Sequence, residues 1–98
     1  MTFRFNRNNA GINMFYTYIL ETADNSYYIG STANLKDRLK RHQNGQIRYT
    51  KSRLPVVLVY KEPYNTRAEA VRREKQLKSW KDRAMLESLI NTFDGPIV

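Results

Sequence analysis

The sequence predicts an α/β fold in which a small, three-stranded, largely antiparallel sheet carries helices on both faces, in the order β-β-α-β-α-α. Residues 15–20 and 27–29 are rich in aromatic and β-branched side chains, and the turn-forming segment 23–26 between them indicates a β-hairpin. Residues 56–60 are almost continuously apolar, a pattern typical of a strand that is covered on both faces. The remaining segments have helix caps and helical periodicity, so they supply that cover.

The predicted hairpin contains two tyrosines that are candidates for function. Alternate residues of a strand share a face, so Tyr18 faces the same side as Tyr16 and Leu20. Tyr28 in the second strand joins that face only if the hairpin loop has an odd number of residues, as in a loop of about three residues with a bulge. A tyrosine in a strand usually packs with its hydroxyl at the rim, and this structural interpretation stays open beside the functional one.

The first helix is predicted over residues 35–44. Asn34 can cap its start, because the side-chain oxygen accepts a free backbone N–H, and Gly45 can end it in the left-handed conformation. At about 100° per residue, Leu35 and Leu39 form a narrow apolar stripe. Five polar residues fall on the far side: Lys36, Asp37, Lys40, Arg41 and Gln43.

Arg38 and His42 differ from the other polar residues of this helix. As an i,i+4 pair they lie at the edge of the leucine stripe, so they should face the body of the protein. A guanidinium and an imidazole held against a sheet could bind a phosphate group. A snorkelling arginine beside a half-buried histidine with satisfied hydrogen bonds is the structural alternative.

Residues 46–55 are predicted to form a loop in which basic side chains flank an aromatic ring. Cations beside a ring that can stack suit contacts with phosphates and bases. The predicted nucleic-acid-binding residues, including one from the preceding helix, are Lys36, Arg48, Tyr49, Lys51 and Arg53. A solvated linker is the alternative.

Thr66 and Glu69 form a predicted capping box at the start of a second helix. Its apolar side carries Ala70, Val71, Leu77 and Trp80, where the helix ends. Arg67 and Glu74 lie two turns apart and both fall inside this apolar arc. A buried carboxylate costs on the order of several kcal/mol unless it is paired or binds a metal. Glu74 is therefore either a metal ligand or the partner of Arg67 or Lys78 in a salt bridge.

The chain is predicted to form one domain over residues 14–91, between a flexible leader over 1–13 and a tail over 92–98. Its last helix begins after Asp82 and its apolar residues indicate a structural role. These residues are Ala84, Met85, Leu86, Leu89 and Ile90. Met14 directly precedes the first strand and could be an alternative start.

The composition excludes several classes of protein. The 98 residues, 41% of them hydrophobic, suffice for one small domain, and the absence of cysteine excludes a disulfide framework or a thiolate metal site. No segment has the apolar core of a signal peptide or the length of a membrane span, so the cytoplasm is the expected location. The net charge of +8 favours nucleic acid as the partner, with solubility alone as the alternative.

The sequence lacks a Ser-His-Asp set, a phosphate-binding glycine loop and a histidine cluster. Two helices instead turn polar residues inward beside a tyrosine-bearing hairpin. Hydrolysis of a phosphodiester needs a carboxylate that binds a metal, an arginine for the phosphate's charge, and a group that positions or deprotonates water. The inward residues include all three kinds of group.

Four motifs together resemble those of the GIY-YIG nuclease superfamily. They are Tyr16-Thr17-Tyr18, Tyr28-Ile29-Gly30, N-L-K-D-R-L-K-R-H over residues 34–42, and Arg67 with Glu74. The similarity extends over residues 14–91, includes Y-T-K-x-R-x-P in the basic loop, and is to small stand-alone bacterial members and Slx-type structure-specific nucleases. Tyr16 replaces the glycine of the first motif, and Ser31 stands where the excision-repair incision subunit has a lysine. An asparagine that some members carry has no clear match.

This resemblance implies a catalytic set, which comprises Tyr18, Tyr28, Arg38, His42, Arg67 and Glu74. Arg38 is implied to contact the phosphate and His42 to assist proton transfer. Glu74 is implied to bind a single Mg²⁺ or Mn²⁺ ion, and Arg67 matches an arginine of the Slx-type branch.

The expected function is that of a divalent-metal-dependent endonuclease that hydrolyses phosphodiester bonds in DNA, in DNA repair or processing. A non-catalytic nucleic-acid-binding module on the same scaffold is the alternative, with RNA also open as the ligand. An inward carboxylate favours the enzyme, because binding a polyanion needs only positive charge. Specificity is expected to come from substrate shape or from a protein partner, since the sequence indicates no second DNA-reading domain.

Overall fold

The computed structural model describes residues 14–93, so the predicted leader over 1–13 and the tail residues 94–98 lie outside the described part. The elements follow the predicted order, with one additional helical turn. They are β1 (Phe15–Glu21), β2 (Tyr27–Thr32), α1 (Leu35–Gln43), α2 (Arg48–Lys51), β3 (Val57–Tyr64), α3 (Arg67–Ser79) and α4 (Arg83–Asn91). The predicted α/β class is confirmed.

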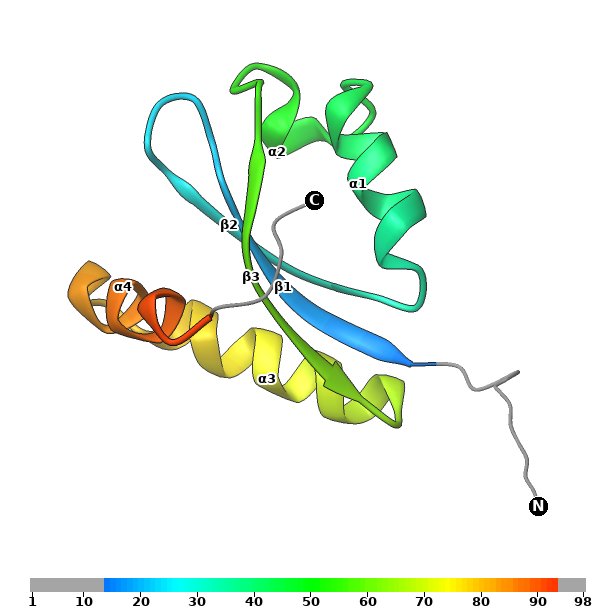
Figure 1. Cartoon of the computed structure of the whole chain (residues 1–98), viewed down its shortest axis with the longest axis vertical. Coiled ribbons are helices and arrows are strands. Elements are labelled where there is room, and N and C mark those ends of the chain that lie inside the picture. Colours follow the sequence, from blue (N-terminus) through cyan, green and yellow to red (C-terminus); the bar gives the residue numbers. More distant parts are fainter. Residues whose placement is uncertain (1–13, 94–98) are drawn as a thin grey trace.

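The three strands form one antiparallel sheet in the order β2-β1-β3. Helix α1 lies on one face of the sheet, and α3 and α4 lie on the other (Figure 1). Each face has its own core: the α1 side buries Tyr18, Leu20, Leu35, Val56 and Leu58, and the opposite side buries Ile19, Ile29, Tyr60, Leu77 and Leu86. The predicted cover on both faces is therefore present, and it removes apolar surface from water on both sides of a small sheet.

The β1–β2 hairpin meets the condition under which the two tyrosines share a face. Tyr18 pairs with Gly30 and Leu20 pairs with Tyr28, so the two tyrosines lie on the same face of the sheet. The hairpin loop covers residues 22–26, which is an odd number of residues, although the loop is longer than the example of three.

Both ends of α1 are formed as the sequence indicates. The Asn34 side chain accepts a hydrogen bond from a backbone N–H of the first turn at 3.0 Å. Gly45 has a φ of 74° and donates its N–H to the His42 carbonyl at 3.0 Å, while the next residue donates to the Arg41 carbonyl at 2.9 Å. This pair of hydrogen bonds is a Schellman motif, and it ends the helix at Gln43. The polar residues predicted on the far side are exposed.

Strand β3 extends beyond the predicted apolar run. It continues through residues 61–64, which are no longer an apolar run, because these pair with the first half of β1. Pro63 is tolerated there since β3 is an edge strand. The expectation of cover on both faces holds in the middle of the run, where Leu58 and Tyr60 are buried, but it is wrong at Val57, which is 48% exposed at the start of the strand.

The basic segment predicted as a loop contains a helical turn, α2. The Lys51 N–H closes it by donating to the Ile47 carbonyl at 2.9 Å. Periodicity cannot indicate such an element, because one turn is too short to repeat a pattern.

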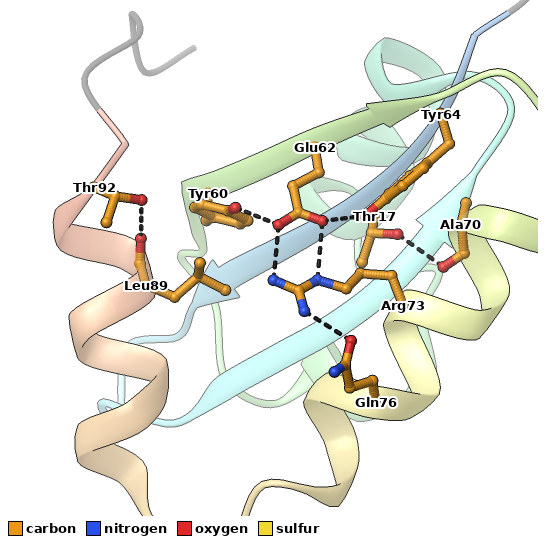
Figure 2. A network of polar contacts seen from close by, with 9 residues as sticks. All are labelled: Thr17, Tyr60, Glu62, Tyr64, Ala70, Arg73, Gln76, Leu89 and Thr92. Atoms are coloured by element: carbon orange, nitrogen blue, oxygen red, sulfur yellow. Dashed lines mark hydrogen bonds and ion pairs between the residues drawn. The ribbon is translucent and has the colours of Figure 1, made fainter.

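Polar contacts fix α3 against β1 and β3 (Figure 2). The Thr17 hydroxyl on β1 donates to the Ala70 carbonyl at 2.8 Å. Glu62 on β3 accepts hydrogen bonds from Nε and Nη2 of Arg73 at 3.0 and 3.1 Å, and from the hydroxyls of two neighbouring tyrosines. This bidentate pair is partly shielded from water, so it should be stronger than an ordinary surface ion pair. Because Glu74 follows Arg73 directly, the same contacts determine where Glu74 lies.

The predicted N-terminal caps of α3 and α4 are present. Thr66 and Glu69 form the capping box, and Asp82 accepts a hydrogen bond from a backbone N–H of α4 at 2.9 Å. Leu86 of α4 is buried against the sheet, whereas Met85, predicted on the same apolar side, is 46% exposed. Adjacent helical residues point about 100° apart, which places Met85 outside the contact.

The packed part of the chain reaches Phe93, whose ring centroid lies 6.0 Å from that of Tyr60. The predicted division into a leader, a domain over 14–91 and a tail stays a prediction, because both ends lie outside the described residues. None of the helices between residues 14 and 93 is long and apolar enough to cross a membrane.

Candidate active site

A close contact between Tyr18 and Gly30 lies at the centre of the site. The two residues pair across β1 and β2, and a Cβ atom on residue 30 would lie 2.6 Å from the Tyr18 hydroxyl oxygen. Side chains do not approach so closely, so only glycine allows the ring to lie over β2 at this position. The glycine of the Tyr28-Ile29-Gly30 motif thus has a steric explanation.

His42 lies on the inner face of α1, is fully buried, and contacts Tyr18. Its Nε2 lies 3.0 Å from the Tyr18 hydroxyl oxygen, and its Nδ1 lies 2.8 Å from Oγ1 of Thr50 in α2. The prediction that His42 faces the body of the protein is therefore confirmed. Sequence reasoning missed Thr50, and its position within Y-T-K-x-R-x-P was the only signal that could have indicated it.

Burial sets the protonation of this pair. It lowers the pKa of His42 to about 4, with a further contribution from the positive charge of Arg38. Burial also raises the pKa of Tyr18; the nearby Tyr28 raises it further, and the charge of Arg38 opposes the shift. At neutral pH the site therefore holds a neutral imidazole, which can accept a proton, hydrogen-bonded to a protonated phenol.

Tyr28 and Tyr49 extend this centre into an aromatic cluster. The Tyr28 ring centroid lies 4.8 Å from that of His42, at an interplanar angle of 70°, and 5.7 Å from that of Tyr49. The edge-to-face contact restricts how the imidazole can turn. The structure thus brings together the tyrosines of both motifs, the histidine of α1 and the predicted base-stacking ring of α2.

Arg38 lies one turn before His42 on α1 and is half-buried, as predicted. Its guanidinium forms no ion pair with any residue between 14 and 93. An arginine whose charge reaches the Tyr18–His42 pair, and which is not neutralised by a described carboxylate, can receive an anionic ligand.

Glu74 is turned inward as predicted, and its side chain is 19% exposed. The Ser31 hydroxyl on β2 donates to Oε1 at 2.6 Å, and the Lys78 ammonium contacts Oε2 at 2.6 Å. Of the two salt bridges considered, the one with Lys78 forms and the one with Arg67 does not. The placement of Arg67 in the buried arc was wrong: it is exposed and lies 5.1 Å from the Phe15 ring centroid.

The predicted nucleic-acid-binding residues divide into two groups. Lys36, Arg48 and Lys51 are exposed, and Tyr49 is 42% exposed. Arg53 instead makes contacts within the protein. Its guanidinium lies 4.1 Å from the Tyr49 ring centroid and donates to that residue's carbonyl at 2.6 Å. Its Nε lies 3.3 Å from a carboxylate oxygen in the hairpin loop, within ion-pair distance but without hydrogen-bond geometry.

The candidate residues lie on the two faces of one edge strand. Tyr18 contacts Gly30 on the α1 side of β2, whereas Glu74 contacts the next residue, Ser31, whose side chain points to the α3 side. A hollow of about 350 Å³ is lined by residues from both sides, among them Lys78, but Tyr28 is the only predicted catalytic residue in its lining. A larger groove of about 750 Å³ beside α1 is lined by none of the predicted catalytic residues.

The site offers a metal ion one carboxylate. No three His, Cys, Asp or Glu side chains gather into a metal site in the part of the chain that the structure describes. Mg²⁺ prefers oxygen ligands and often keeps several waters while it binds one or two carboxylates and the substrate's phosphates, and Mn²⁺ accepts the same ligands. Glu74, with the Ser31 hydroxyl beside it, fits an ion that is held in this way.

Comparison with known proteins identifies the family. Residues 14–87 match the GIY-YIG catalytic domain. The UPF0213 protein SH2523 of Staphylococcus haemolyticus is 41% identical over 75 residues, which cover 76% of this chain and 92% of that protein. A UPF0213 protein of Pediococcus pentosaceus is 47% identical over 68 residues, which cover 68% of this chain and 72% of that protein. The solution NMR structure of the UPF0213 protein BH0048 from Bacillus halodurans is 36% identical, with a TM-score of 0.55 and coverage of 85% of this chain and 88% of that one. The chain therefore belongs to the GIY-YIG family of nuclease domains.

Proposed function

We propose that the protein is a divalent-metal-dependent endonuclease that hydrolyses phosphodiester bonds in DNA, in DNA repair or processing. The observation that carries the proposal is the buried hydrogen bond between the Tyr18 hydroxyl and the neutral His42. Binding a polyanion needs positive charge and gains nothing from a buried neutral imidazole. General-base catalysis, in contrast, needs a proton acceptor of this kind. Membership of a nuclease family supports the same reaction class.

In the proposed reaction, Tyr18 and His42 together remove a proton from the attacking water. Tyr18 is not a free phenolate at neutral pH, because burial raises its pKa. Tyr18 is fully buried, so the side chains over it must move before the attacking water can reach its oxygen. That oxygen can then accept the water's proton as its own proton passes to Nε2 of His42. The water oxygen then forms the new bond to phosphorus, and the bond from phosphorus to the 3′ oxygen breaks.

The positive charges are proposed to act at two distances from the scissile phosphate. Arg38, beside Tyr18 and His42, would stabilise the charge that develops on the phosphoryl oxygens. Arg67 lies two helical turns, roughly 10 Å, from Glu74 along α3, which suits a phosphate further along the strand. The exposed residues Lys36, Arg48 and Lys51 would bind the flanking backbone.

We propose that Glu74 binds the single Mg²⁺ or Mn²⁺ ion. When bound, the ion supplies Lewis-acid stabilisation of charge on the leaving 3′ oxygen. The Ser31 hydroxyl orients one carboxylate oxygen, and the Lys78 side chain, which is 54% exposed, can turn into solvent and free the other.

The direct test is to incubate the purified protein with Mg²⁺ or Mn²⁺ and labelled duplex, flap, junction and single-stranded DNA, and with RNA. We expect metal-dependent cleavage of at least one DNA substrate and none in the presence of a chelator. Arg38→Ala, purified in parallel, controls for contaminating nucleases. The proposal fails if no substrate is cut with either metal.

The pairing of Glu74 with Lys78 favours the alternative, a nucleic-acid-binding module without turnover, because it satisfies the carboxylate without a metal. Glu74→Gln separates the two functions. If Glu74 binds the metal, this variant loses metal-supported cleavage and retains nucleic-acid binding, because a neutral amide is a poor ligand for a hard cation. A variant that melts at a lower temperature but cleaves normally per folded molecule would mean that Glu74 only forms a salt bridge.

A further inference from the structure

Thr50 makes a buried contact with the His42 imidazole, and this contact has no role in the reaction proposed above. Thr50 is fully buried, and its Oγ1 lies 2.8 Å from Nδ1 of His42 and 3.4 Å from the Ile47 carbonyl oxygen. The other ring nitrogen, Nε2, lies 3.0 Å from the Tyr18 hydroxyl oxygen. A neutral imidazole carries a proton on only one ring nitrogen, which donates a hydrogen bond while the other nitrogen accepts one. The direction of the hydrogen bond at one nitrogen therefore determines its direction at the other.

The two tautomers differ in how many buried protons find an acceptor. With the proton on Nδ1, His42 donates to Thr50, Thr50 donates to the Ile47 carbonyl, and Tyr18 donates to Nε2. With the proton on Nε2, Thr50 donates to Nδ1 and Tyr18 accepts from Nε2. The phenol proton then loses its well-aligned acceptor, because among residues 14–93 only His42 makes a hydrogen bond of normal geometry with the Tyr18 hydroxyl, although Tyr28 and Arg38 also lie near it.

The second arrangement is disfavoured on two counts. The Tyr18 side chain is 0% exposed, so water does not replace the missing acceptor, and a buried donor without a partner is destabilising. It also releases the Ile47 carbonyl from the Thr50 hydroxyl, although that carbonyl keeps the N–H of Lys51. The count of hydrogen bonds therefore favours a proton on Nδ1.

We propose that Thr50 holds His42 as the tautomer with its proton on Nδ1, so that Nε2 presents a lone pair to the Tyr18 hydroxyl. Thr50 is then a positioning residue, which acts through His42 and does not touch the substrate. The role depends on α2, which places the Thr50 hydroxyl beneath α1.

The catalytic consequence rests on the proposed function. A proton can pass from Tyr18 to His42 only if Nε2 is unprotonated, and free imidazole side chains in water prefer the opposite tautomer. Thr50 would thus provide the direction of proton transfer that the Tyr18–His42 pair needs.

The test is a ¹⁵N NMR spectrum of the two ring nitrogens at neutral pH. His42 is the only histidine of the chain, so both signals are assigned without ambiguity. A nitrogen that bears a proton and one with a free lone pair differ strongly in chemical shift. We expect the signal of a protonated Nδ1 and an unprotonated Nε2 in the wild-type protein, and a proton on Nε2 would overturn the proposal without any variant.

Two variants then test whether Thr50 is responsible. Thr50→Val keeps the shape of the side chain but has no hydroxyl, so the Nε2-protonated tautomer should become populated. Thr50→Ser restores the hydroxyl and should restore the wild-type signals. The proposal is wrong if Thr50→Val retains the wild-type tautomer, or if Thr50→Ser, which is the less disruptive change, loses it.

Cleavage assays add a separate readout. Thr50→Val should lower the cleavage rate by about 10²-fold, the lower end of what a positioned general base contributes, with Thr50→Ser close to wild type. If the wild-type protein cleaves nothing, the proposed function fails while the tautomer result still stands. If it cleaves and Thr50→Val shifts the tautomer without lowering the rate, the catalytic consequence is wrong.

Discussion

Mild acid should destabilise the fold through His42. Its pKa is lowered from 6.5 to about 4 in the folded protein, because the imidazole is buried. The unfolded chain therefore takes up a proton below pH 6.5, whereas the folded protein does not until about pH 4. The stabilising contribution is complete above pH 6.5 and is lost as the pH falls through this window.

The loss of stability in mild acid can be worked out from the shift in the pKa of His42. Each pH unit within the window changes the free energy of unfolding by about 1.4 kcal/mol, so the whole window corresponds to about 3 kcal/mol. Domains of this kind are typically stable by about 5–15 kcal/mol, which makes the loss easy to measure. Glu62 and Asp24 also have lowered pKa values, but they bind protons in the unfolded chain only near and below their ordinary values of 4.5 and 3.8.

The assay is urea unfolding at several pH values between 7 and 5, on the wild-type protein and on His42→Gln. Glutamine cannot titrate but keeps a polar group near Tyr18, so the difference between the two curves isolates the histidine. Between pH 6.5 and 5 the wild type should lose about 2 kcal/mol and the variant much less. Two curves that run parallel over this range would refute the assignment of a buried neutral imidazole.

Three further predictions concern other parts of the site. Gly30→Ala should cost about 1–3 kcal/mol in the free energy of unfolding, because the new Cβ forces the tyrosine ring above it to move; an unchanged melting temperature would contradict that contact. Arg38→Lys should lower the cleavage rate much more than the affinity, since an ammonium keeps the charge but cannot hold a phosphate with two parallel hydrogen bonds, and equal cleavage would remove Arg38 from the catalytic set. Replacing Arg48 and Lys51 together by alanine should weaken binding to every substrate and make the slope of log affinity against log salt concentration shallower by about two units. Arg53→Ala should instead mainly lower the melting temperature, because Arg53 makes its contacts within the protein. An unchanged slope in the double variant would mean that this segment is only a linker.

Features that depend on neighbouring residues could be predicted from the sequence. Asn34 and Gly45 determine the ends of α1 through their own side chain and backbone, and the capping box at Thr66 acts within one turn. The shared face of Tyr18 and Tyr28 follows from strand alternation once the loop has an odd length. Such features need no knowledge of how distant segments pack.

Contacts between distant segments could not be predicted in this way. Thr50, the hydrogen-bond partner of His42, lies 8 residues away along the chain. Ser31, the partner of Glu74, lies 43 residues away. No periodic pattern links either pair. Arg67 illustrates the opposite error. Helical angles placed it in the buried arc, but burial also requires a neighbour that covers the position, and the first residue of α3 stays exposed.

The alternation of side chains along β2 explains how one strand can join the two parts of the proposed site. Gly30 leaves room for Tyr18, and thus for the Tyr18–His42 pair, on one face, while Ser31 orients Glu74 on the other. Within residues 14–93, β2 is an edge strand, so no further strand separates these faces, and a hollow of about 350 Å³ lies beside its first half, at residues 27–29. A phosphodiester that lay over either face of the sheet would reach only one set of groups. We therefore expect the scissile phosphate to cross the outer edge of β2 at these two residues, where the proposed general base and the carboxylate proposed to bind the metal can act on opposite sides of the same phosphorus.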